Sequence, residues 1–256
     1  SLGETLEEIA SEKAGILKPG VPVVCGVEAS EAYQTIREKA EACHSPFAGV
    51  FDQEGCFQTN RKKQGYEFVY RINETFYSYA PSLPGRHQGK NAAIAIAMAE
   101  ELTKGWEKLD KEKIILGIET TRWDGRLEVI DRQPLIVMDG AHNIEGAMAL
   151  REYVQAFIDS PLVLVFAAMN DKKIEELTDI LFPLAHTVIL TQFPYYRAAA
   201  PREILQTSSK FQGKIKLEPD ISRAIPLALD SAGRDGTVLI TGSLFLVGEV
   251  KKLFTF

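Results

Sequence analysis

The fold class of this chain is decided by residues 134–150, PLIVMDGAHNIEGAMAL. The first five residues are almost wholly apolar, which is typical of a short buried strand, and apolar residues return at helical spacing from Ile144 onward. Strand, polar turn and helix in this order form the first half of a βαβ unit. Ligands of open parallel sheets bind at such turns. This turn contains Asp139 and His142, which indicate either a ligand site or merely a helix-capping acid beside a surface histidine.

The chain beyond residue 126 alternates strands with helices in the same way. The pattern predicts strands at 127–130, 135–138, 162–167, 187–191, 214–217 and 237–241, and helices at 144–157, 172–181, 201–208, 221–231 and from 244 to 252. Such alternation implies a parallel sheet that is covered by helices on both faces. The fold class is therefore α/β.

The first part of the chain is less regular. Thr5 and Glu8 have the spacing of a capping box, which predicts that a helix begins there. The pattern further predicts a strand at 21–27, a helix at 30–42, paired strands at 66–70 and 75–79, and helical stretches at about 88–102 and at 105–119. Residues 46–63 give only short pieces rich in turns. A polar, glycine-containing segment then precedes the change of pattern, so we expect a hinge at 123–125 between domains 1–122 and 123–256.

The composition is that of an ordinary globular protein and excludes several classes. With 256 residues, 45% hydrophobic and 25% charged, the chain is long enough for two domains of usual size. A net charge of −6 argues against a nucleic-acid or membrane partner, and no apolar run approaches the roughly 20 residues of a membrane span. No signal peptide opens the sequence, and three scattered cysteines favour the reduced thiols of a cytoplasmic protein.

The familiar nucleotide and metal motifs are absent from the sequence. It contains no G-x-x-x-x-G-K-[ST] loop, no G-x-G-x-x-G after a strand, no H-E-x-x-H and no paired cysteines. What remains is a set of polar residues at expected loop and helix-end positions: Lys13, Arg86, Asn91, Arg126, Asp139, His142, Asp171, Lys172, Arg197 and Ser243. Their spacing alone supports only an α/β domain whose cleft faces another domain.

Four longer stretches resemble a known family. They are residues 2–24 (LGETLEEIASEKAGILKPGVPVV), 83–93 (LPGRHQGKNAA), 120–130 (TTRWDGRLEVI) and 135–146 (LIVMDGAHNIEG), with weaker likeness at 171–172, 191–201 and 241–250. They resemble the folylpolyglutamate synthase/dihydrofolate synthase family, which belongs to the Mur-ligase superfamily of ATP-dependent amide-forming enzymes. The resemblance extends over essentially the whole chain.

The resemblance implies that only part of the family's architecture is present. Residues 1–122 would be the C-terminal part of a Mur-ligase-type ATPase domain, and residues 123–256 a Rossmann-like C-terminal domain. The phosphate-binding loop, a magnesium-binding glutamate and a nearby histidine would lie upstream of Ser1. We therefore expect the isolated chain to be inactive, and its first domain to be loose or prone to associate because a sheet edge and apolar surface are uncovered.

The resemblance also implies roles for five residues. Lys13 matches a lysine that is carbamoylated and helps to hold magnesium, and Asn91 matches a residue that contacts adenine. Arg126 matches an arginine that reaches the ATP phosphates, while Asp139 and His142 match the C-terminal domain's contribution to the nucleotide. By residue type alone, Lys13 would be a solvated lysine at a helix end and Asn91 a capping residue in the first turn of its helix. The family usually has proline where this sequence has Asp124, which implies a less rigid hinge beside Arg126.

The implied reaction is an ATP-dependent ligation with magnesium as the metal. ATP would phosphorylate a folate-linked carboxylate, and the amine of glutamate would attack the acyl phosphate, with the two domains closing on the nucleotide. Arg197 and Ser243 are the candidates for binding glutamate. The protein would be a cytoplasmic monomer. Two alternatives stay open: another amino-acid ligase of the superfamily, such as a peptidoglycan-precursor ligase, or a non-catalytic fragment.

Overall fold

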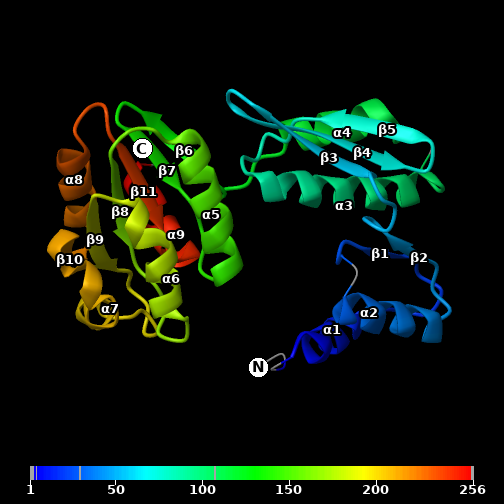
Figure 1. Cartoon of the computed structure of the whole chain (residues 1–256), viewed down its shortest axis with the longest axis horizontal. Coiled ribbons are helices and arrows are strands. Elements are labelled where there is room, and N and C mark those ends of the chain that lie inside the picture. The colour runs from blue at the N-terminus through cyan, green and yellow to red at the C-terminus, as the bar shows by residue number, and fades with distance from the viewer. Residues whose placement is uncertain (1–2, 4, 29, 107, 255–256) are drawn as a thin grey trace. The chain divides into compact units, whose positions relative to one another are not determined.

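The computed structural model describes residue 3 and residues 5–28, 30–106 and 108–254. The chain divides into two compact units (Figure 1). The first unit comprises Ser1–Ser82 and Arg86–Thr121, and the second comprises Leu83–Gly85 and Arg122–Phe256. Each unit has its own hydrophobic core and is described by itself.

The second unit is built around a six-stranded sheet with the strand order β10-β9-β8-β11-β7-β6. Its elements are β6 (Glu128–Arg132), β7 (Leu135–Met138), α5 (Ile144–Phe157), β8 (Leu162–Phe166), α6 (Ile174–Leu181), η1 (Phe182–Leu184), β9 (Thr187–Gln192), α7 (Pro201–Thr207), η2 (Ser209–Lys214), β10 (Ile215–Asp220), α8 (Ile221–Ala232), β11 (Thr237–Thr241) and α9 (Leu244–Phe254). The predicted strands and helices beyond residue 126 are all present, with ends that differ by a few residues.

The sheet is parallel except at one edge, where the prediction was wrong. Strands β7 to β11 pair in parallel, whereas β6 pairs antiparallel with β7. Only Gln133 and Pro134 separate these two strands. A parallel pair needs a crossover of a dozen or more residues, so a two-residue connection permits only a hairpin.

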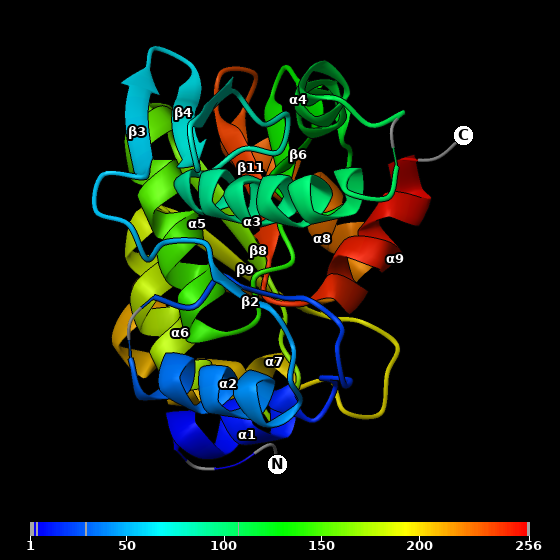
Figure 2. The same ribbon diagram turned by 90° about the vertical axis from the view of Figure 1, so that its right-hand side faces the viewer.

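The four central strands, β9, β8, β11 and β7, are largely apolar because both of their faces are covered, whereas the edge strand β10 is half polar and partly exposed. Val137, Leu164 and Leu239 point into the core beneath α5, α6 and α7. Their chain neighbours Ile136 and Val163 point to the opposite face, where they pack against α8 and α9. Figure 1 shows α5 and α6 side by side on one face, and Figure 2 shows α9 beside α8. Side chains alternate along a strand, so two covering layers require apolar residues at every position.

The first unit combines a parallel strand pair with an antiparallel three-stranded sheet, β3-β4-β5. Its elements are α1 (Leu6–Ala14), β1 (Val23–Cys25), α2 (Glu31–Ala42), β2 (Phe47–Gly49), β3 (Phe57–Lys62), β4 (Gly65–Ile72), β5 (Thr75–Tyr79), α3 (Arg86–Thr103) and α4 (Lys111–Thr120). The capping box of Thr5 and Glu8 and the β4–β5 hairpin are confirmed. Strand β3 was missed because most of its side chains are polar and exposed. No helix in the described ranges is long and apolar enough to cross a membrane.

The three-stranded sheet lies beside α3 (Figure 1), and aromatic side chains of the sheet share a hydrophobic core with this helix. A side chain at Gly89 would place its Cβ 2.2 Å from the ring of Phe68, so this helix position must be glycine. The hydroxyl of Tyr79 donates a hydrogen bond to the Gly89 carbonyl at 2.8 Å. The small residues of α3 therefore allow the aromatic sheet face to approach the helix backbone closely.

We predict that replacing Gly242 by alanine destabilises the second unit by about 2 kcal/mol or more, because the change combines a left-handed backbone with a steric clash. Gly242 has φ +105°, and an added Cβ would lie 2.4 Å from the Ala167 carbonyl oxygen. The matched control is Gly213→Ala, where a Cβ meets nothing within 4 Å. Urea unfolding of both variants measures the difference, and equal midpoints would contradict the prediction.

Candidate functional site

The turn after β7 lies where the connections of the sheet diverge. Helices α5 and α6, which follow β7 and β8, cover one face of the sheet. Strand β11 lies between these two strands, yet its following helix, α9, covers the other face. Connections that leave neighbouring strands toward opposite faces open a crevice at the carboxyl edge, the position at which ligands of open α/β sheets bind.

A cavity of about 140 Å³ lies at this edge. It is lined by residues from the three turns that follow β7, β8 and β11: His142, Met169, Lys172, Gly242, Ser243, Leu244 and Phe245. Backbone hydrogen bonds hold the turns together, from Gly242 N–H to the Ala141 carbonyl at 3.1 Å and from Ala167 N–H to the Thr241 carbonyl at 3.4 Å. The cavity therefore has a fixed frame with a basic and a hydroxyl side chain.

His142 is held in one orientation by its own turn. Its Nδ1 lies 2.8 Å from the carbonyl oxygen of Gly140. A carbonyl oxygen can only accept, so Nδ1 carries the proton and, in the neutral ring, Nε2 presents a lone pair. The ring is half-buried and lines the cavity, which suits it to accept a proton from a bound amine.

Asp139 does not cap the helix, which was one of the two interpretations of this turn. Asn143 is the N-cap of α5, and its Oδ1 accepts from Gly146 N–H at 2.9 Å. Asp139 is 8% exposed, and its two oxygens accept from Leu127 N–H at 3.0 Å and Ala141 N–H at 2.9 Å. Burial raises the pKa of Asp139, and the two N–H groups, Arg126 and His142 counter this effect only in part.

The carboxylate of Asp139 and the backbone of Gly140 together fix the backbone on the two sides of Arg126. Gly125 and Leu127 both have left-handed backbones, with φ +68° and +47°. Such a conformation is unusual for leucine, and the bond from Leu127 N–H to Asp139 stabilises it. The Gly125 carbonyl in turn accepts from Gly140 N–H at 2.8 Å. Arg126 is half-buried between these two anchored residues and lies within electrostatic range of Asp139.

Lys13 and Asn91 belong to the first unit, whereas Arg126, Asp139 and His142 belong to the second. Lys13 is exposed in the last turn of α1. Helix α3 begins at Arg86, earlier than predicted, which places Asn91 in its second turn and rules out a capping role. The Asn91 amide donates to Gln88 Oε1 at 3.0 Å. Within the described part of the chain, no three His, Cys, Asp or Glu residues gather to hold a metal ion.

The two candidates for binding glutamate have different surroundings. Arg197 forms an ion pair with Asp171, and it does not line the cavity. Ser243 is 3% exposed, lines the cavity and accepts from Phe245 N–H at 3.2 Å, which leaves its hydroxyl proton to donate. Lys172 had no assigned role, although its position after β8 places it at the same sheet edge as His142. That shared edge is the signal that sequence reasoning overlooked.

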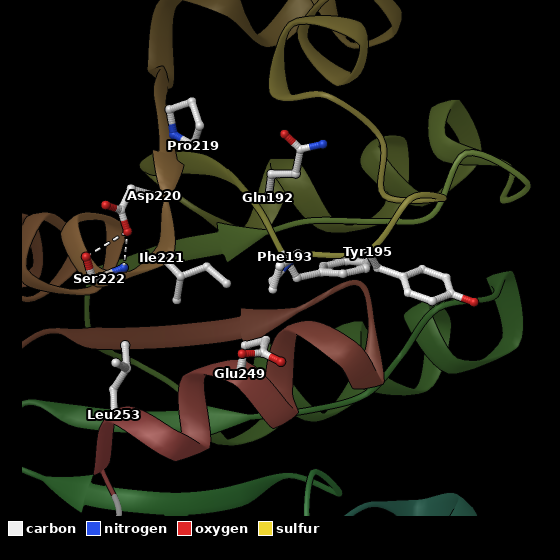
Figure 3. A pocket seen from close by; sticks show the side chains of 10 residues that line it. Gln192, Phe193, Tyr195, Pro219, Asp220, Ile221, Ser222, Glu249 and Leu253 are labelled. Carbon is white, nitrogen blue, oxygen red and sulfur yellow. Dashed lines mark hydrogen bonds between the residues drawn. The ribbon is translucent and has the colours of Figure 1, made fainter.

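A second, larger cavity of about 540 Å³ lies at the ends of β9 and β10 (Figure 3). Phe193 and Tyr195 form one wall, and Asp220 and Glu249 supply carboxylates. Asp220 accepts from the Ser222 backbone N–H at 2.8 Å and from its hydroxyl at 2.7 Å. Among the residues that the structure describes, no lysine or arginine lines this cavity, so those residues are unsuited to phosphate or carboxylate groups despite the cavity's greater volume.

The match to known proteins covers the part of the chain that holds this site. A family model described as "Dihydrofolate synthetase, C-terminal domain" matches residues 126–253, which is 128 of the 256 residues. The chain belongs to the dihydrofolate/folylpolyglutamate synthase family. The motif resemblance is thus confirmed, and the α/β fold class with it.

Relatives of this family match nearly the whole chain. The dihydrofolate synthase/folylpolyglutamate synthase of Bacillus subtilis is 35% identical over 254 residues, which are 98% of this chain and 59% of the relative. The folylpolyglutamate synthase of Lacticaseibacillus casei is 30% identical over 98% of this chain and 58% of the relative. The structure of Mycobacterium tuberculosis folylpolyglutamate synthase complexed with ADP matches with a TM-score of 0.87 at 24% identity and covers 100% of this chain and 60% of that one. The chain therefore spans less than two thirds of the length of these relatives.

We predict that Asp139→Asn destabilises the second unit by about 1–3 kcal/mol at neutral pH, since an amide can accept only one of the two backbone hydrogen bonds. The second unit's free energy of unfolding in urea measures this loss. Unchanged stability would show that the carboxylate does not hold the turn.

We also predict how the destabilisation caused by Asp139→Asn depends on pH. The raised pKa means that the folded chain binds this proton more tightly than the unfolded chain. The stability that Asp139 contributes is therefore full below the ordinary aspartate pKa and falls as the pH rises through the raised value. The difference in unfolding free energy between the native chain and Asp139→Asn should widen as the pH is lowered toward about 4. A difference that is independent of pH contradicts this prediction.

Proposed function

We propose that this chain carries part of the nucleotide site and the glutamate site of an ATP-dependent ligase that adds glutamate to folate. The observation that carries the proposal is the gathering of Arg126, Asp139 and His142 at one sheet edge, beside a cavity with Lys172 and Ser243. Family membership supports it, because the relatives are named as folylpolyglutamate and dihydrofolate synthases. The ADP in the Mycobacterium tuberculosis structure supports ATP as the nucleotide.

The proposed reaction has two steps. The γ-phosphoryl group of ATP passes to a folate-linked carboxylate and gives an acyl phosphate and ADP. The amine of glutamate then attacks the acyl carbon, the amide forms, and inorganic phosphate leaves as the amine loses a proton. Catalysis of this kind depends on alignment and on neutralisation of developing phosphate charge.

Arg126, Asp139 and His142 have distinct parts in this proposal. Arg126 neutralises phosphate charge, because a guanidinium presents several donors in a fixed plane. Asp139 contributes to the nucleotide site mainly by holding the backbone that presents Arg126. His142 accepts the amine proton at Nε2, the nitrogen that its turn leaves unprotonated in the neutral ring.

The small cavity is the proposed glutamate site. Lys172 and the hydroxyl of Ser243 are placed to bind a carboxylate. Helix α9 begins at Leu244, which also lines the cavity, and a helix N-terminus favours negative charge. His142 at the opposite turn would face the amine. Arg197 is the weaker candidate because Asp171 already neutralises it.

Lys13 and Asn91 stay as proposed contributors from the first unit, Lys13 to magnesium and Asn91 to adenine. The described residues do not by themselves fit a magnesium site, since no group of three acidic, histidine or cysteine ligands forms among them. A carbamoylated Lys13 would supply one oxygen ligand, and other ligands would have to come from residues outside this set. No step of the proposal depends on the metal's position.

The domain assignments are also proposals: residues 1–122 as the C-terminal part of the ATPase domain and residues 123–256 as the Rossmann-like ligase domain. The compact units divide near this boundary, which supports it. The three cysteines are unpaired, which favours a cytoplasmic protein, and a monomer remains our expectation. Another amino-acid ligase of the superfamily is the alternative, and comparing glutamate with other amino acids as substrates separates the two.

We predict that Lys172→Met raises the KM for glutamate by about 10- to 100-fold, because a charge-assisted hydrogen bond is lost. The KM for ATP should change little. The assay is ATP-dependent glutamate addition by a protein that contains the phosphate-binding loop together with this chain. Lys173→Met is the matched control, because Lys173 is exposed and pairs with Glu176. An unchanged glutamate KM in Lys172→Met would contradict the assignment of the cavity.

We predict that the 256-residue chain alone neither hydrolyses ATP nor adds glutamate, because its sequence contains no Gly-Lys-Ser/Thr phosphate loop. Phosphate release and glutamate incorporation are the measurements. Supplying the loop on a separate polypeptide should restore turnover if the two pieces associate. Turnover by the chain alone, abolished by Arg126→Met, would show that the loop is dispensable.

A further inference from the structure

Lys251, near the end of α9, forms two ion pairs that the proposed reaction does not use. Its Nζ lies 2.7 Å from Asp124 Oδ2 and 2.8 Å from Glu128 Oε1. The Lys251 side chain is 33% exposed and that of Glu128 is 22% exposed, whereas that of Asp124 is 76% exposed. Hydrogen bonds to the two carboxylates raise the pKa of Lys251, so the ammonium form is the one that bridges them.

The bridge continues from Glu128 into the backbone before Arg126. The second carboxylate oxygen of Glu128 accepts from Gly125 N–H at 2.8 Å. Gly125 has a left-handed backbone, and a Cβ there would lie 3.0 Å from Val247 of α9. The turn at 124–127 is therefore held against α9 by packing and by a chain of charged hydrogen bonds that ends at Lys251.

Two sets of bonds together determine where Arg126 sits. On one side, Asp139 and Gly140 bind the backbone of Leu127 and Gly125. On the other side, Asp124 and Glu128 connect the same turn to Lys251. Arg126 lies between two residues with left-handed backbones. Both sets of bonds fix this backbone, and the backbone sets the direction of the Arg126 side chain.

We propose that Lys251 is a positioning residue for Arg126, which acts through Glu128 and Asp124 to hold the 124–127 turn. The clamp, defined as Lys251, Glu128 and Asp124, deepens the proposed function and rests on it for the role of Arg126. Lys251 itself need not touch any substrate.

The two arms of the clamp contribute unequally. The Asp124 arm is mostly exposed, so solvent and salt screen it. The Glu128 arm is more buried and is the arm that reaches the backbone N–H of Gly125. Glu128→Gln should therefore loosen the turn more than Asp124→Asn does. High salt should loosen the turn about as much as Asp124→Asn does.

Amide hydrogen exchange on the 256-residue chain tests the clamp without any assay of activity. In Lys251→Met, exchange at Gly125 should accelerate about fivefold or more, as expected for the loss of one supporting hydrogen bond. Exchange at Leu164, in the centre of β8, should stay constant and so report that the fold is intact. Lys251→Arg should restore slow exchange, and Lys252→Met, which removes only an exposed pair with Glu249, should have no effect.

Ligase kinetics on a protein that joins a phosphate-binding loop to this chain test the link to Arg126. Lys251→Met should lower kcat with little change in the glutamate KM, and should have no further effect in an Arg126→Met background. Effects that multiply would show that Lys251 does not act through Arg126. Unchanged Gly125 exchange in Lys251→Met overturns the clamp itself. If the unsubstituted protein has no ligase activity, the proposed function is refuted. The exchange experiment would still show whether the clamp holds the 124–127 turn.

Discussion

The buried carboxylate of Asp139 is the contact on which the organisation of the site depends. It joins two separate turns of the chain: the strained turn that presents Arg126 and the turn that presents His142. One oxygen stabilises a leucine in a left-handed conformation, and the other shapes the turn that orients the histidine ring. Because the group is buried, its two hydrogen bonds are made where water cannot replace them, and their loss would be costly. Asp139 is thus as much a structural residue as a ligand candidate.

The sheet explains why these turns meet. The four central parallel strands, β9, β8, β11 and β7, are largely apolar on both faces, so the helices must divide between two covering layers. Strand β11 enters between β7 and β8, and its helix leaves toward the opposite face. This topology places the carboxyl ends of three strands together and separates the helices that follow, which leaves room for Lys172, Ser243 and His142 around one cavity.

Local patterns predicted much of this fold and only part of the site. Residues 134–150 gave the strand and helix at their observed bounds, and the motifs around them identified the family. Strand β6 turned antiparallel because a two-residue connection overrides the alternation pattern. The left-handed backbone of Leu127 had no local signal, since leucine rarely adopts it, and the contact to Asp139 spans 12 residues. Lys251 and Glu128 are 123 residues apart in the chain, and a contact over this separation cannot be predicted from a single sequence. The roles of Lys13 and Asn91 stay predictions.

The most direct test is a structure of a protein that joins a phosphate-binding loop to this chain, bound to a non-hydrolysable ATP analogue and glutamate. We expect the Arg126 guanidinium to lie at the phosphates. We expect glutamate in the cavity, with a carboxylate at Lys172 and Ser243 and its amine at His142 Nε2. The contacts of Asp139 with Leu127 and Ala141 should persist. Glutamate bound away from that cavity, or Arg126 directed away from the nucleotide, would contradict these expectations.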